Sequence, residues 1–303
     1  MNRSGIIGDL LAWLEEQLDK PLSLDDVAAR SGYSKWHLQR KFKETTGQVL
    51  GAYIRARRLS HAAMALRLTS RSLADIALQY HFESQQTFTR AFKKQFQQTP
   101  AFYRRSLRWD FFGIQPPIGR ASCAYAPAEI VMLPALRLEG ITRSYTCTLE
   151  QLSRHRAELR AQFWRTFLEE AQSSPPVVYG LCYSRPAVDK NGENEVFYTT
   201  AAEPAFLPVK SDNLQELSLN AGDYALFTYL GPAGGLQGFI MDLYSVCLPL
   251  MRMVRRDGYD IERFHRWPSS SNDDGSGEIH CDYLIPILQT AAADVMPVQG
   301  PAA

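Results

Sequence analysis

The segment between Ser34 and Gly47 places side chains that can read nucleic-acid bases on one stripe of a predicted helix. Glutamine can form two hydrogen bonds with adenine, arginine can do so with guanine, and lysine can meet a phosphate. Leu38 and Phe42, four residues apart, form the opposite stripe, which we expect to face a core. A solvated polar face is the alternative interpretation. The outward residues are Trp36, Gln39, Arg40 and Lys43.

The same pattern occurs a second time about 50 residues later. Residues 23–28 (SLDDVA) return as residues 72–77 (SLADIA) at an offset of 49, and residues 38–43 (LQRKFK) return as residues 88–93 (FTRAFK) at an offset of 50. A merely solvated face rarely recurs in duplicate, so the repeat favours DNA reading. The outward residues of the second stripe are Gln85, Gln86, Thr89, Arg90 and Lys93.

Helices must position both stripes, and the local sequence predicts two helix-turn-helix units. Ser23 lies three residues before Asp26, which is the spacing of a capping box, and Gly32 supplies the tight turn before the first reading helix. Residues 51–68 form a connecting helix of about 20 residues, which would be about 30 Å long. One turn of B-DNA spans about 34 Å, so one chain could place two helices in successive major-groove segments.

The charge is distributed unevenly along the chain of 303 residues. Residues 1–119 carry 18 Lys and Arg against 10 Asp and Glu, a net charge of +8, whereas the remainder carries 15 against 22, a net charge of −7. A basic module joined to an acidic one suggests that the first half contacts nucleic acid. Seven arginines around the two units are candidate phosphate clamps, with a solubilising surface charge as the alternative for each: Arg55, Arg57, Arg58, Arg67, Arg104, Arg105 and Arg108.

The acidic half follows a linker, and its sequence predicts the order strand-helix-strand-strand twice. This order predicts an α+β fold of two facing halves with a pocket between them. Aromatic walls and a carboxylate in such a pocket would suit apolar or cationic organic ligands. The candidate ligand-binding residues are Asp282, Glu195, Tyr179, Tyr198, Trp267 and Tyr283, although the pattern favours an outward strand position for each acid.

Several classes of function lack support in the sequence. No nucleophile–base constellation appears, so no catalytic residue and no enzyme activity are predicted. The six histidines show no paired metal spacing, so neither a metal site nor a cofactor is predicted. No apolar run approaches the about 20 residues that span a membrane, and the N-terminus is not a signal peptide, so a cytoplasmic, nucleoid-associated protein is expected.

Residues 6–105 closely resemble the AraC/XylS family of bacterial transcription regulators, nearest to the subgroup of MarA, SoxS and Rob. The resemblance rests on GYSKWHLQRKFKETTG, FESQQTFTRAFKKQF and TPAFYRR. It implies a seven-helix unit in which the positions matching seven stripe residues contact bases: Trp36, Gln39, Arg40, Gln85, Gln86, Thr89 and Arg90. The chain departs from many members at His81, where they have glycine in the second turn. Histidine tolerates positive φ better than most residues, so a modest stability cost is expected.

Residues of about 125–288 resemble the GyrI-like domain, most clearly in YALFTYLG and CDYLIPI. The resemblance implies an effector cleft with an acid in the last strand, at Asp282. The expected organisation is an all-α DNA-binding domain (1–112), a linker (113–124), an α+β effector domain (125–288) and a disordered tail (289–303).

The two resemblances together imply a ligand-responsive activator of stress, efflux or drug-tolerance genes. It would bind promoter DNA as a monomer, work with RNA polymerase and sense a small-molecule effector. Two alternatives stay open: a hydrolase activity of the GyrI-like domain, and an architectural nucleoid protein with weak sequence specificity.

Overall fold

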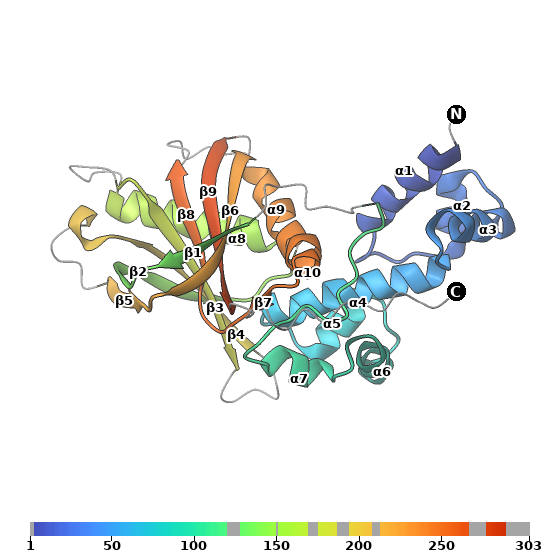
Figure 1. Ribbon diagram of the computed structural model, residues 1–303, viewed down its shortest axis with the longest axis horizontal. Helices are drawn as coiled ribbons and strands as arrows, with labels where there is room; N and C mark the ends of the chain where they lie inside the picture. Colours follow the sequence, from blue (N-terminus) through green and yellow to red (C-terminus); the bar gives the residue numbers. More distant parts are fainter. Residues whose placement is uncertain are drawn as a thin grey trace.

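The chain folds into an N-terminal group of helices and a C-terminal sheet with its own helices (Figure 1). This confirms the predicted fold class, an all-α domain with two helix-turn-helix units followed by an α+β domain. Among the described residues, no helix combines the length and the apolar character needed to cross a membrane. The computed structural model describes residues 3–119, 128–149, 151–168, 175–186, 194–207, 213–266 and 277–288.

The helical unit uses the predicted start and stop signals. Ser23 and Asp26 form the reciprocal capping box, and Gly32 ends the following helix in the left-handed conformation at a φ of 69°. His81 occupies the matching turn of the second unit at a φ of 59°, as expected for a residue in place of glycine. The helices are α1 (Arg3–Glu15), α2 (Leu24–Ser31), α3 (Lys35–Thr46), α4 (Leu50–Leu68), α5 (Leu73–Gln79), α6 (Gln85–Phe96) and α7 (Pro100–Arg105).

Helix α4 joins the two helix-turn-helix units and contributes to both of their cores. Its first turns place Leu50 and Tyr53 against Leu38 and Phe42 of the first unit. Its second half, from Leu59 to Leu68, belongs to the core of the second unit, which continues into the C-terminal domain. The second helix-turn-helix unit is therefore packed directly against the C-terminal domain.

The C-terminal domain is built on a nine-stranded sheet in the order β1-β6-β9-β8-β3-β4-β2-β5, with β7 also paired to β9. The neighbouring strands are antiparallel. The strands are β1 (Glu129–Leu133), β2 (Leu136–Tyr145), β3 (Val178–Pro186), β4 (Asn194–Ala202), β5 (Gln215–Leu219), β6 (Gly222–Pro232), β7 (Val254–Arg255), β8 (Asp260–Arg266) and β9 (Glu278–Leu288).

The predicted repeat is present as β2-α8-β3-β4 and β6-α9-β8-β9. The first helix of the repeat begins at Leu152, and its α-helical part ends at Phe163, where one wider π-helical turn follows. The first strand segment of the acidic half consists of two strands, β1 and β2. The helical elements are α8 (Leu152–Phe163), η1 (Trp164–Leu168), η2 (Pro204–Phe206), η3 (Ala233–Gly235), α9 (Leu236–Asp242), η4 (Leu243–Cys247) and α10 (Leu248–Leu250).

The described part of the predicted linker, residues 113–119, packs along α4 instead of running free. Ile114 is buried, and the backbone N–H of Gln115 donates to the Ser60 hydroxyl at 2.9 Å. The Gln115 carbonyl accepts a hydrogen bond from Arg57, which needs an acceptor because it is buried. Residues 120–124 of the linker and the whole tail from residue 289 lie outside the described residues.

Candidate functional site

The first candidate reading helix, α3, presents its predicted face to solvent. Ser34 caps its N-terminus, and Leu38 and Phe42 are fully buried beneath it. Gln39, Arg40 and Lys43 are exposed, and Trp36 is 69% exposed, an unusual position for a large aromatic side chain. The Arg40 guanidinium lies 5.5 Å from the centre of the Trp36 ring, and its Nε donates to Glu44 at 2.8 Å.

The second candidate reading helix, α6, repeats this arrangement. Ser84 caps the helix, and Phe88, Phe92 and Phe96 form its buried side. Its outward residues Gln85, Gln86, Arg90 and Lys93 are exposed, whereas Thr89 is only half-exposed and donates its hydroxyl to the Gln85 carbonyl at 2.8 Å. The polar stripe and the apolar stripe therefore lie where the spacing predicted them, on both helices.

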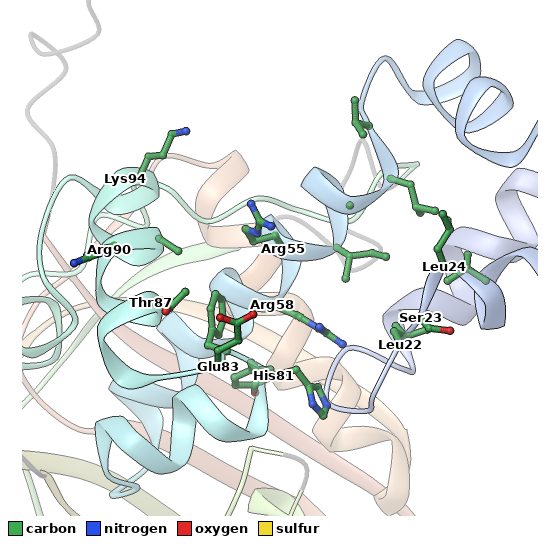
Figure 2. A pocket seen from close by; sticks show the side chains of 18 of the residues that line it. Leu22, Ser23, Leu24, Arg55, Arg58, His81, Glu83, Thr87, Arg90 and Lys94 are labelled. Carbon is green, nitrogen blue, oxygen red and sulfur yellow. The ribbon is translucent and has the colours of Figure 1, made fainter. Parts of the chain in front are cut away.

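The two units enclose a shared basic hollow of about 770 Å³. Gln39 borders it from α3, and Thr87, Arg90 and Lys94 border it from α6. Figure 2 shows Arg55 and Arg58 reaching into the hollow from α4, between the two units. Positive charge concentrated in a concavity attracts a polyanion more strongly than the same charges on a flat surface. Lys94 was absent from the residues singled out in the sequence, although its charge next to Lys93 was a usable signal.

Three of the arginines expected as candidate phosphate clamps instead donate to acceptors inside the protein; Arg57 and Arg104 are buried and Arg67 is half-buried. Arg57 is 1% exposed and forms an ion pair of 2.7 Å with Glu15 of α1. Arg104 is buried and donates to the Arg71 carbonyl. Arg67 donates to three carbonyls at the end of α7, and burial together with the charge of Arg255 lowers its pKa to about 10.

The strongest electrostatic feature of the C-terminal domain is a buried carboxylate, Glu262 of β8. Its oxygens accept from Arg156 at 2.9 Å and from Arg160 at 2.7 Å, both on α8. Tyr198 of β4 donates to the same carboxylate at 2.6 Å, and burial raises the pKa of this hydroxyl, so it keeps its proton. A Cβ at Gly180 would collide with Tyr198 and Glu262, so only glycine leaves room for this contact.

A hollow of about 280 Å³ lies between helix α8 with its π-helical turn and strands β2 and β4. Leu159, Phe163 and Phe167 form its apolar part, and Arg143 supplies a charge at its edge. Tyr198 lines this hollow and also donates to Glu262, so it connects the hollow to the buried ion-pair cluster. Glu262 was not among the residues singled out in the sequence, although it alternates in phase with the apolar Phe264.

The predicted ligand-binding residues do not share one cavity within the described part of the chain. Alternation along the strands is the reason, since adjacent residues face opposite sides of a sheet. Of the six, only Tyr198 lines the hollow beside α8. Tyr283 is buried near Asp260, and Trp267 lies outside the described residues. Asp282 bonds Thr228 and Arg263, Tyr179 contacts Glu203, and Glu195 is paired with Arg185 at the surface.

Two family models match the chain: a helix-turn-helix domain over residues 27–106 and a GyrI-like small molecule binding domain over residues 127–288. The transcriptional regulator Rob of Salmonella typhimurium (strain LT2) is 52% identical over 287 residues, which are 95% of this chain and 99% of the relative. This chain belongs to the Rob family of transcription regulators. It is a DNA-binding regulator with an AraC-type helix-turn-helix domain and a GyrI-like ligand-binding domain.

Further relatives agree with this membership of the Rob family. The right origin-binding protein of Escherichia coli (strain K12) is also 52% identical over 287 residues, again 95% of this chain and 99% of the relative. The regulatory protein SoxS of the same organism is 53% identical over 107 residues, which are 35% of this chain and all of SoxS. The Rob family therefore extends over both domains, whereas the similarity to SoxS covers about a third of the chain.

Proposed function

We propose that this regulator binds promoter DNA as a monomer, with α3 and α6 in successive segments of one major groove. The supporting observation is that Gln39 of α3 and Arg90 of α6 border one basic hollow, so the two helices could engage the same side of a duplex. An asymmetric site of about 20 base pairs would suffice, because both reading helices belong to one chain. The proposed base and phosphate contacts are Trp36, Gln39, Arg40, Lys43, Gln85, Gln86, Thr89, Arg90 and Lys93.

Binding titrations at fixed salt, on a selected cognate duplex and on a scrambled one, test this proposal. Gln39→Ala and Arg90→Ala should each cost about 1–3 kcal/mol on the cognate duplex and little on the scrambled one. Lys93→Ala is the matched control, because loss of a phosphate contact weakens both duplexes alike and reduces the salt slope by about 1. If Gln39→Ala and Arg90→Ala weakened binding to the cognate and the scrambled duplex equally, as Lys93→Ala should, the result would favour the architectural alternative and contradict base reading.

We further propose that the protein acts in the cytoplasm at the nucleoid. Its proposed partner is RNA polymerase, and its targets would be stress, efflux or drug-tolerance genes. An in-vitro transcription assay on a template that carries the cognate site tests this part. The expected result is a rise in transcript that Arg90→Ala abolishes, and the contrary result is binding without any change in transcript.

The effector site is proposed to be the hollow between α8 and strands β2 and β4, and its ligand a small organic molecule with an apolar body. Leu159, Phe163 and Phe167 would bury that body. A cationic ligand would have to compete with Arg156 and Arg160 for Glu262, because that carboxylate is already paired with both. Thermal shift with a hydrophobic cation and its uncharged analogue therefore distinguishes the two ligand types.

A contiguous set of side chains leads from the region of Glu262 to the DNA-binding domain. Asp260, two residues along β8, accepts from the Tyr244 hydroxyl and pairs with Arg255 at 2.9 Å. The Tyr244 ring stacks on the Trp109 ring with 5.1 Å between the ring centres. The Arg67 guanidinium, from α4, lies over the Trp109 ring at 5.4 Å from its centre. A ligand that prefers one arrangement of this set would change DNA affinity.

The regulator is proposed to bind its effector without turnover. Product analysis after incubation with candidate esters and amides separates sensing from the hydrolase alternative. The expected result is a thermal shift without product, both in the wild type and in Asp282→Ala and Glu195→Ala. Product formation that one of these two variants abolishes would establish the enzyme instead.

A further inference from the structure

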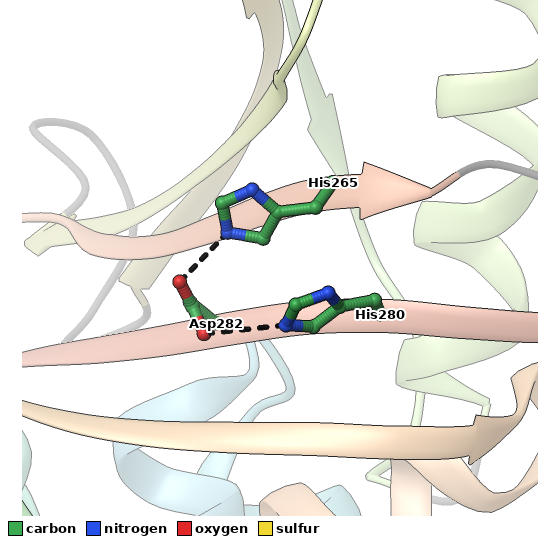
Figure 3. Close-up of side chains that lie close together, drawn as sticks. All are labelled: His265, His280 and Asp282. Atoms are coloured by element: carbon green, nitrogen blue, oxygen red, sulfur yellow. Dashed lines mark hydrogen bonds and ion pairs between the residues drawn. The ribbon is translucent and has the colours of Figure 1, made fainter.

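Three side chains of metal-ligand type meet on the surface of the sheet, away from the hollow beside α8. They are His265 of β8 and His280 and Asp282 of β9 (Figure 3). One ligand atom from each lies within 4.8 Å of the other two. Nε2 of His265 is 2.7 Å from Oδ2 of Asp282, and Nε2 of His280 is 3.9 Å from Oδ1 of the same carboxylate.

We propose that this cluster binds one divalent transition-metal ion of the zinc class, through two imidazoles and one carboxylate. Imidazole nitrogen and carboxylate oxygen are ligands that zinc accepts at about 2.0–2.2 Å. Ligand atoms at that distance around a tetrahedral ion lie about 3.3 Å apart. The nitrogen–oxygen distances, 2.7 Å from His265 to Oδ2 and 3.9 Å from His280 to Oδ1, lie on either side of this separation, so small side-chain rotations would bring the three groups to the distances that an ion requires.

The backbone holds the three ligands on rigid elements. His280 and Asp282 are two residues apart on β9 and so share a face of the sheet. Asp282 pairs with Arg263 on β8, and the register shifts between Phe264 and Arg266. This irregularity falls at His265, whose ring lies 4.6 Å from that of His280.

Neighbouring groups support a bound ion in one respect and oppose it in another. Thr228 of β6 donates to Oδ1 of Asp282 at 2.8 Å, which orients the carboxylate as groups outside the metal ligands commonly do. Arg263 donates to Oδ2 at 3.0 Å, and its positive charge competes with a cation for that oxygen. The site is therefore expected to bind more weakly than it would without this arginine.

Access and an open coordination position distinguish the cluster from a closed structural site. The side chains of His265 and His280 are 32% and 39% exposed, whereas that of Asp282 is 12% exposed. An ion can therefore reach the nitrogens from solvent while the carboxylate stays held by the sheet. Three protein ligands leave a fourth position for water or for an added ligand.

The experiment is a zinc titration of the full chain after dialysis against a chelator, followed by calorimetry, with cobalt(II) absorption as a second readout. One ion per chain should bind, and His265→Gln and His280→Gln should each weaken binding at least tenfold. Arg263→Gln should strengthen binding about tenfold, because it removes a cation next to the ion. His155→Gln, at a histidine on α8, is the matched control and should bind as the wild type does.

Several outcomes would overturn the proposal. They are no stoichiometric uptake by the wild type, an unchanged affinity in His280→Gln, and an equal loss in His155→Gln. A cobalt spectrum with thiolate bands would assign the ion to cysteines instead. Circular dichroism without metal checks that each variant folds, and Asp282→Asn, which keeps an acceptor for Thr228, should lose binding while the fold stays intact.

Discussion

His61, in the middle of α4, should make the stability of the DNA-binding domain depend on pH. Burial lowers the pKa of His61 to about 3 from its ordinary value of 6.5, and the charge of Arg57 acts in the same direction. The imidazole Nε2 lies 3.4 Å from an Arg57 nitrogen, and the ring packs edge-on to Tyr80 of the second unit. Between about pH 6 and pH 3, the His61 ring therefore stays neutral in the folded chain but is protonated in the unfolded chain.

The difference between the folded and unfolded pKa of His61 sets the direction and the size of the change in unfolding free energy with pH. A folded-state pKa below the unfolded one contributes stability that is fully present above pH 6.5 and is lost as the pH falls towards 3. Between pH 8 and pH 5, a fall from 6.5 to about 3 removes about 2 kcal/mol of unfolding free energy. Glu15 does not interfere, because its own pKa is lowered below 4.5: burial raises it, but the hydrogen bond and charge of Arg57 outweigh burial.

Urea unfolding of the wild type and of His61→Gln, followed by circular dichroism at several values between pH 8 and 5, measures this effect. Glutamine keeps an acceptor for Arg57 and does not titrate. The unfolding free energy of His61→Gln should therefore fall by about 2 kcal/mol less than that of the wild type over this pH range. His155→Gln is the control for a partly exposed histidine and should follow the wild type. Parallel curves for the wild type and His61→Gln would show that titration of His61 does not cause the loss of stability.

Five further substitutions, at three positions, test other contacts. Glu262→Gln leaves Arg156 and Arg160 buried without a full counter-charge, and should cost about 3–5 kcal/mol in urea unfolding. Trp109→Ala empties the stacked contact between the domains and should cost about 3–5 kcal/mol, with a smaller loss for Trp109→Phe; equal losses would contradict a packing role. His81→Val places a branched side chain at a φ of 59° and should lower stability by about 1–2 kcal/mol in urea unfolding, whereas His81→Asn should be nearly neutral.

The helical half could be predicted because its signals are local. Caps, turns and the three-and-four spacing involve residues within one or two helical turns of each other, so Ser23, Gly32 and His81 could be assigned from neighbours alone. The outward stripes of α3 and α6 follow from the same periodicity once their buried residues are known. The local sequence did not show which arginines lie near the shared basic hollow. Arg57 is buried by its contact with α1, and Arg67 is half-buried between the carbonyls at the end of α7 and the Trp109 ring.

The faces of the strands in the C-terminal domain could not be predicted from local sequence. Alternation predicted the strands, but a strand has two faces, and only its neighbours decide which face meets a helix, a cavity or solvent. Asp282 was singled out as the acid of the effector pocket, yet Glu262 is the carboxylate that contacts α8 and Tyr198. The alternation along β8 indicates that Glu262 points inward only once Phe264, two residues further on, is known to be buried on the same face.

The sequence by itself determined the two-module organisation, the duplicated helix-turn-helix units and the side chains they turn outward, because each depends on contacts a few residues apart. Tertiary structure alone decided what joins the modules, namely the stacking of Trp109 on Tyr244, and which acid enters the ion-pair cluster. It also decided that His265 meets His280 and Asp282, which are 15 and 17 residues away along the chain. Strand register brings such residues together, and register depends on the whole sheet rather than on any one segment.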